Sequence, residues 1–166
     1  MREVTSAVAN KLLKTLSEEK EYLLALERDS SVYVLADGEK TAPPVYNYDE
    51  VQAKIDAIDT KVRNIKHAIN VFNTTTVLDK IDITIDEALV EMAQLTRKKE
   101  KLDMMRKRLP KTRVSNYRNS NVIEYQYVNY DLEKVQKDYS EVCERITEIQ
   151  VALDLANQTK IFVIED

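Results

Sequence analysis

Apolar residues recur at alternating steps of four and three along residues 49–73, which is the spacing of a coiled-coil seam. The members of this seam are Val51, Ile55, Ile58, Val62, Ile65, Ile69 and Phe72. A second seam of the same regularity runs through residues 131–157, and its members are Val135, Tyr139, Val142, Ile146, Ile149, Leu153 and Ala156. This periodicity predicts two long helices, each with one face suited to packing against another helix.

Two further segments, residues 5–29 and 84–108, carry looser apolar stripes of helical period. The expected inward residues of the first are Val8, Leu12, Leu13, Leu16, Leu23 and Leu26. Those of the second are Ile85, Leu89, Met92, Leu95, Leu102 and Met105. The chain is therefore predicted to contain four helices of similar length.

The composition agrees with long helices. Among 166 residues there are one glycine and three prolines, while 43% of residues are apolar and 33% are charged. A β-sandwich or barrel would need more glycine for its turns, and 166 residues suit one domain with a real core. We therefore predict a single all-α domain over residues 1–166, an antiparallel up-down-up-down four-helix bundle with short β-like segments in its linkers.

Side chains that can cap helices mark the predicted boundaries. Hydroxyl, carboxylate and amide oxygens accept hydrogen bonds from the free amides of a first helical turn. The expected caps are Thr5 or Ser6, Asp49, Thr84 and Asn129 or Asp131. Thr84 and Glu87 have the spacing of a capping box. The expected helix ends lie near Ser30, Asn73 and Pro110.

The linkers contain most of the aromatic residues. In an up-down bundle the linkers 30–48 and 110–130 lie at the same end, so seven of the nine tyrosines should gather there: Tyr33, Tyr46, Tyr48, Tyr117, Tyr125, Tyr127 and Tyr130. Residues 32–35 and 122–128 are rich in β-branched and aromatic residues, which predicts short strands that pair with each other. The apolar tail, residues 161–164, is expected to pack beside residues 77–78 and 81–83.

Few residues suit catalysis or metal binding. Cys143 is the only cysteine and His67 the only histidine, which excludes an internal disulfide and a zinc site made of cysteine and histidine. Asn64 stands where a Glu-x-x-His metal motif would need glutamate, and Gly38 alone cannot form a phosphate-binding loop. We predict a protein that is not an enzyme, with no catalytic residues, metal or cofactor. The absence of a long apolar run and of an export signal predicts a cytoplasmic location without a membrane span.

The positive charge is concentrated in one segment. Residues 97–118 hold ten lysines and arginines but only Glu100 and Asp103, a net charge of +8, so the rest of the chain carries −12 of a total of −4. Cations beside tyrosines suit phosphate contact and base stacking on single-stranded nucleic acid. The candidate surface comprises Arg106, Lys107, Arg108, Lys111, Arg113, Arg118, Tyr117, Tyr125 and Tyr127. The alternative is structural, since cations near a helix C-terminus complement its dipole and pair with acidic neighbours.

Four short segments resemble a family of uncharacterised bacterial helical proteins labelled septicolysin-like. The matching segments are residues 69–74, 83–89, 131–136 and 145–150. The resemblance implies a helical fold, and the label implies a pore-forming cytolysin. From the residues themselves, the first expectation is a non-enzymatic helical module that binds a protein partner or a second copy of itself. Nucleic-acid binding through residues 97–118 is the alternative, and pore formation is a second alternative from the label alone.

Overall fold

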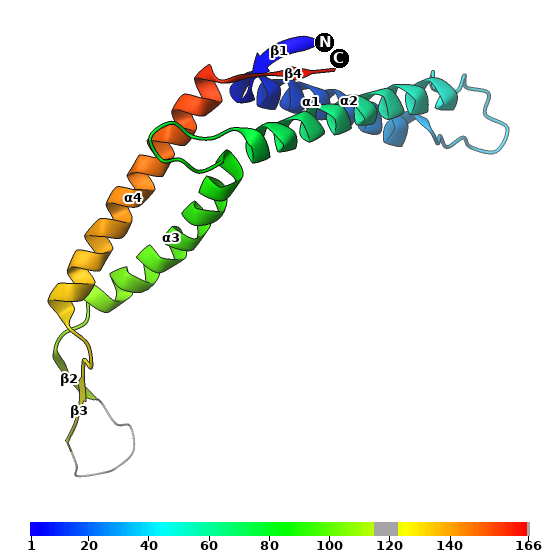
Figure 1. Ribbon diagram of the computed structural model, residues 1–166. Coiled ribbons are helices and arrows are strands. Elements are labelled where there is room, and N and C mark those ends of the chain that lie inside the picture. The colour runs from blue at the N-terminus through cyan, green and yellow to red at the C-terminus, as the bar shows by residue number, and fades with distance from the viewer. Residues whose placement is uncertain (115–122, 166) are drawn as a thin grey trace. The chain divides into compact units, whose positions relative to one another are not determined.

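The chain is mostly helical, as its composition predicts (Figure 1). The computed structural model describes residues 1–114 and 123–165. Its helices are α1 (Ser6–Ser30), α2 (Tyr48–Thr75), α3 (Ile85–Arg106) and α4 (Leu132–Thr159). Its strands are β1 (Arg2–Thr5), β2 (Lys111–Val114), β3 (Glu124–Tyr127) and β4 (Ile161–Ile164).

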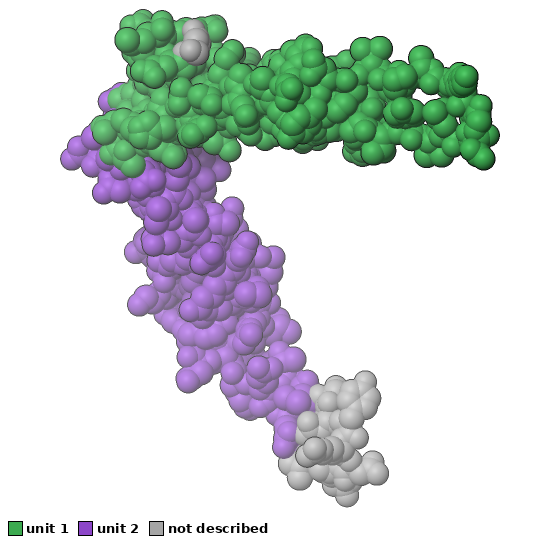
Figure 2. Space-filling model, turned by 90° about the vertical axis from the view of Figure 1, so that its right-hand side faces the viewer, with its two compact units in different colours: residues 1–76, 155–166 green, residues 77–154 purple. Residues whose placement is uncertain are grey.

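The chain divides into two compact units, which are distinguished by colour in Figure 2. Unit 1 comprises Met1–Thr76 and Leu155–Asp166, and unit 2 comprises Val77–Asp154. Each unit has its own buried apolar residues. The single domain over residues 1–166 stays a prediction.

In unit 1, the seam of α2 packs against the apolar stripe of α1. Leu23, late in α1, is buried with Val51 and Ile55 from the start of α2. Ala9, early in α1, is buried with Ile65 from the second half of α2. The two helices therefore run in opposite directions, and most of the residues expected to face inward do so.

A short antiparallel sheet closes one end of unit 1. In the described chain β4 pairs with β1, so that Val4 is opposite Phe162. The Phe162 ring stacks on Phe72 with 4.6 Å between the ring centroids, and Ile164 is buried. β1 is the strand that pairs with this tail; its packing beside residues 77–78 and 81–83, which belong to unit 2, stays a prediction. Only Val4 is strongly apolar in β1, so its sequence does not mark it as the partner strand.

Residues 77–84 form a turn within unit 2. Val77 pairs with Thr84, and the amide of Leu78 donates to the carbonyl oxygen of Ile83 at 2.8 Å. Thr84 then caps α3 in the predicted capping box, because its hydroxyl accepts from the Glu87 amide while the Glu87 carboxylate accepts from the Thr84 amide.

The seam of α4 packs against α3 in unit 2. The buried cluster consists of Leu102, Val135, Val142 and Ile146. Ile149 and Leu153 of the same seam are also buried. One inward residue of α3 was wrong: Leu89 is 48% exposed, and Ala88 is fully buried instead. Consecutive residues stand about 100° apart around a helix, so turning the face toward Ala88 carries Leu89 outward.

An ion pair joins α3 to α4. Arg145 donates from Nε to Oε1 of Glu91 at 2.8 Å and from Nη2 to Oε2 at 3.0 Å. The hydrogen bonds from Arg145 hold the pKa of Glu91 below its usual value of 4.5. Because the carboxyl pKa is lowered on folding, this pair stabilises unit 2 at a pH above 4.5. Its contribution disappears as the pH falls through the pKa of Glu91 in the folded state.

We therefore expect Glu91→Gln to lower the melting temperature at pH 7. The difference from the wild type should shrink as the pH falls below 4.5 and through the lowered pKa of folded Glu91, because below both values Glu91 is protonated in the folded and in the unfolded state. Thermal melts at pH 7, 5 and 3 measure this. The control is Glu100→Gln, which changes an exposed residue on the same helix and should have little effect on the melting temperature. If Glu91→Gln lowered the melting temperature equally at pH 7 and at pH 3, the role of the ion pair would be contradicted.

Two further sequence expectations change and one is confirmed. The cap of α2 is Asn47, whose side-chain oxygen accepts from the Glu50 amide, and not Asp49. Asp131 caps α4 as one of the two expected residues, accepting from the amides of Glu133 and Lys134. Residues 32–35 form no strand, and β3 pairs with β2 instead. A hairpin partner nearby in the chain closes a much shorter loop than a partner in another linker, which favours the local pairing.

Candidate nucleic-acid interface

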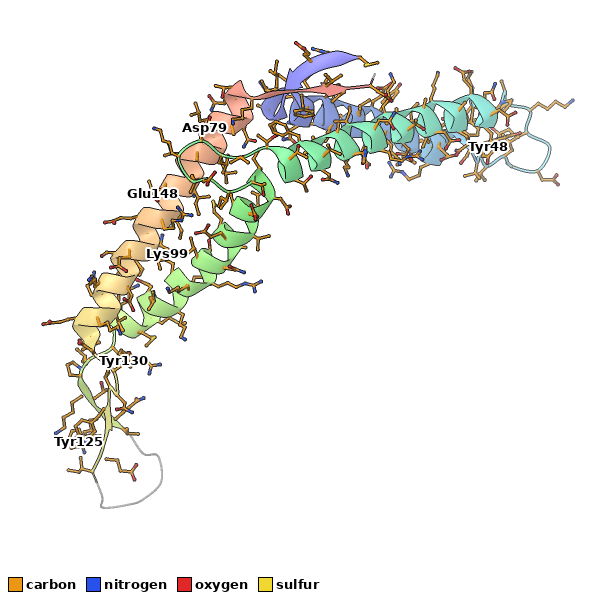
Figure 3. All side chains as sticks on the ribbon, in the orientation of Figure 1. Tyr48, Asp79, Lys99, Tyr125, Tyr130 and Glu148 are labelled. Atoms are coloured by element: carbon orange, nitrogen blue, oxygen red, sulfur yellow. The ribbon has the colours of Figure 1, made fainter. Side chains whose placement is uncertain are left out.

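The candidate surface centres on the β2–β3 hairpin of unit 2. Lys111 is directly opposite Tyr127, and Arg113 is directly opposite Tyr125. Opposite residues of an antiparallel pair lie on the same face, and residues two apart in a strand do too. These four residues therefore share one face of the hairpin, which we call the ribbon face. Figure 3 labels Tyr125 on it.

The ribbon face places two cations on β2 opposite two aromatic rings on β3. The Nζ atom of Lys111 is 4.0 Å from the ring centroid of Tyr125 and 5.4 Å from that of Tyr127. Tyr125 is 44% exposed and Tyr127 is 63% exposed. Cation–π attraction at these distances holds the lysine beside both rings while leaving much of their surface in water. The arrangement can offer flat apolar surface and positive charge to the same ligand.

A hollow of about 400 Å³ lies where the hairpin joins the end of α3. Lys107 and Arg108 line it from the α3 side, and Thr112, Gln126 and Tyr127 line it from the hairpin. The amide of Val128 donates to the carbonyl oxygen of Pro110 at 3.1 Å and so closes the base of the hairpin. Lys107 and Arg108 therefore lie beside the base of the hairpin, on the side of Thr112 and Gln126, which face away from the ribbon face. Sequence reasoning missed Thr112 and Gln126, which only the strand register identifies.

Two of the predicted cations are already engaged in unit 2. Arg106 and Lys107 both donate to Asp103, and the Arg106 guanidinium lies 4.1 Å from the centroid of the Tyr139 ring. The hydrogen bond to Asp103 raises the pKa of Arg106. Arg106 therefore links α3 to α4, which is the structural role weighed for this segment. Arg108, Lys111 and Arg113 are exposed and make no ion pair within the described residues.

The other predicted tyrosines have different positions. Tyr117 and Arg118 lie outside the described residues. Tyr130 donates its hydroxyl hydrogen to the carbonyl oxygen of Met105 at 2.8 Å, so it anchors the start of α4 to α3. Tyr46 donates to Glu27 in unit 1. The linker tyrosines belong to two separate units, and their gathering at one end stays a prediction.

Other candidate chemistry is sparse in the described residues. His67 is exposed on α2 and Cys143 is half-buried on α4. Within residues 1–114 and 123–165, no group of three histidine, cysteine, aspartate or glutamate side chains is placed to hold a metal ion. None of the helices in the same residues has both the length and the apolar character that crossing a membrane requires.

Comparison with known proteins identifies a similar fold. No protein-family model matches this sequence, and no curated protein does. A crystal structure of a functionally unknown conserved protein from Corynebacterium diphtheriae is similar, with a TM-score of 0.62 and 17% sequence identity. The similarity covers 98% of this chain and 100% of that chain. At this identity the likeness establishes a shared fold.

Proposed function

We propose that this protein binds single-stranded nucleic acid through the ribbon face. The observation that carries the proposal is the position of Lys111 beside the exposed rings of Tyr125 and Tyr127. Aromatic rings stack on bases of any sequence, each contributing about 1–3 kcal/mol, while lysine and arginine contact the phosphates. Arg113 on the same face adds positive charge for contact with the phosphate backbone.

The spacing of the two rings favours a single strand over a duplex. Residues two apart along a strand are separated by roughly 6.7 Å. Bases in a duplex are stacked about 3.4 Å apart, and their flat faces are covered by their neighbours. A base can lie on each tyrosine only after the nucleic acid has unstacked, which a single strand does at lower cost than a duplex.

Tyr125→Ala and Tyr127→Ala should each weaken binding of a fluorescent single-stranded oligonucleotide roughly 5- to 150-fold, because each removes one stacking surface. Lys111→Ala and Arg113→Ala should each reduce the slope of log K against log salt by about 0.7, because one phosphate contact is lost. Fluorescence anisotropy between 25 and 200 mM salt, with mixed DNA and RNA oligonucleotides, measures both effects.

Tyr22→Ala is the matched control, since Tyr22 is an exposed tyrosine on α1 in unit 1. It should leave affinity unchanged. Absence of binding by the wild type at low salt would remove the proposal. Equal loss of affinity in the Tyr22 and Tyr125 variants would show that the ribbon face is not the site.

A second candidate function is self-association, the first expectation from the sequence. It is supported by the tip loop, residues 31–47, which joins α1 to α2. This loop exposes Val34 and Val45 almost completely to water and Val32 to 75%. Exposed apolar clusters of this kind are typical of interaction surfaces. Light scattering over a range of protein concentrations tests this function independently of nucleic acid.

The up-down-up-down four-helix bundle stays a prediction about how the two units pack together. A compact chain of this length should have a radius of gyration of about 15 Å. Small-angle X-ray scattering of the monomer is the measurement, and a value well above that would contradict one compact bundle.

A further inference from the structure

Unit 1 contains a segment that has the composition of a strand but no strand partner. Residues 32–35, Val-Tyr-Val-Leu, are β-branched, aromatic or apolar, and they pair with no strand in the described chain. The side chain of Val34 is 95% exposed. A partner strand would satisfy the backbone of this segment and cover its apolar side chains.

Unit 1 also contains a groove beside β4. A hollow of about 540 Å³ is lined by Ile161, Phe162, Val163 and Glu165 on one side, and by residues of α2 that include His67 and Val71 on the other. Successive residues of a strand face opposite sides of a sheet, so a hollow that touches three in a row follows the edge of the strand. None of the residues that line this hollow belongs to β1. We therefore assign the hollow to the edge of β4 that does not pair with β1.

We propose that residues 32–35 of a second copy of this chain add as a strand to the open edge of β4. This inference rests on the self-association proposed above and names its interface. The added strand would cover the exposed side chains of Ile161 and Val163 and would rest on Val71 of α2. Four strand residues span roughly 13 Å, which fits the roughly 16 Å of α2 between Asn64 and Thr75 that line the groove.

The occupant must come from another molecule. The tip loop and β4 lie at opposite ends of the α1–α2 hairpin (Figure 1). Residues 48–63 of α2 separate the tip loop from the groove by about 24 Å. Residues 31–35 reach at most about 17 Å beyond Ser30 when fully extended, so they cannot fill the groove of their own molecule. In a two-fold symmetric dimer, the α1–α2 hairpins of the two copies would lie antiparallel, and the tip loop of each copy would reach the groove of the other. Both grooves are then filled, so the assembly closes as a dimer.

Charge favours an antiparallel direction for the added strand. Asp37 and Glu39 follow the segment in sequence. β4 is preceded by Lys160 and followed by Glu165. An antiparallel strand brings the two acidic residues toward Lys160 and keeps them away from Glu165, whereas a parallel strand would bring them toward Glu165.

The test compares dimerisation of the full-length wild type with that of Val34→Lys and Val163→Lys. We expect a wild-type dimer in light scattering and an at least tenfold weaker dimer in each variant, because each places a charge in the interface. Val45→Lys is the matched control, since Val45 is 99% exposed in the same loop but outside the paired segment. Circular dichroism at low concentration checks that all variants melt like the wild type.

Crosslinking provides a second measurement in a Cys143→Ser background. Mixing Val34→Cys with Val163→Cys and adding a short bis-maleimide should crosslink the mixture much more than either protein alone. A wild-type dimer that Val34→Lys and Val163→Lys leave unchanged would overturn this interface but not self-association. A wild type that stays monomeric at every concentration would overturn both.

Discussion

Ile149→Ala is expected to lower the free energy of unfolding of unit 2 by about 2–5 kcal/mol. Ile149 lies in the seam of α4 and is fully buried. Truncating a buried isoleucine removes apolar contacts and leaves a cavity that the close-packed neighbours fill only in part. Urea denaturation followed by circular dichroism at 222 nm measures the change through the midpoint of the transition.

Val151→Ala provides the matched control on the same helix. Val151 is two residues further along and 64% exposed, so its truncation should change the free energy of unfolding by less than about 0.5 kcal/mol. Equal effects of the two substitutions would contradict the packing of the α4 seam. The comparison is informative because both residues are β-branched and lie in the same helix.

Removal of residues 160–166 is expected to lower the melting temperature of the protein by roughly 5–10 °C. Phe72 loses the ring of Phe162 that stacks on it, and the buried side chain of Ile164 is lost from the cluster around Val4. A net loss of about 2–3 kcal/mol shifts the melting temperature of a chain of this size by that amount. Thermal melts of the truncated and full-length proteins measure the effect.

Ile161→Ala is the control for this truncation, because it changes the tail without removing a buried side chain. Ile161 is on β4 but mostly exposed, so the single substitution should shift the melting temperature by less than about 2 °C. Phe162→Ala should account for a large part of the effect of the truncation. An unchanged melt after truncation would show that the tail does not stabilise unit 1.

Much of the helical structure was predictable from local pattern. The α2 seam, the Thr84–Glu87 capping box and the buried face of α4 are where the sequence places them. These features depend on residues within one or two helical turns of each other, so their physics is contained in a short window. The apolar character of residues 161–164 also predicted a docked tail.

Errors arose where contacts are distant in sequence. The partner of β4 is β1, which lies more than 150 residues away and has only one strongly apolar residue. Residues 32–35 have strand composition without a strand partner, because β propensity needs a neighbouring strand to become structure. The candidate surface was predicted by composition, but composition could not distinguish Arg106, engaged with Asp103, from Lys111 on the ribbon face.

The sequence by itself determined which segments are helices and which face of each helix is apolar, because helix formation and amphipathicity follow from the order of neighbouring residues. Only the tertiary structure decided that β1 pairs with β4, and that Lys111 and Arg113 share a face with Tyr125 and Tyr127. Strand register links residues far apart in the chain, and a shift of one residue would move every side chain to the opposite face. The proposed nucleic-acid surface therefore depends on a pairing that no single segment of the sequence encodes.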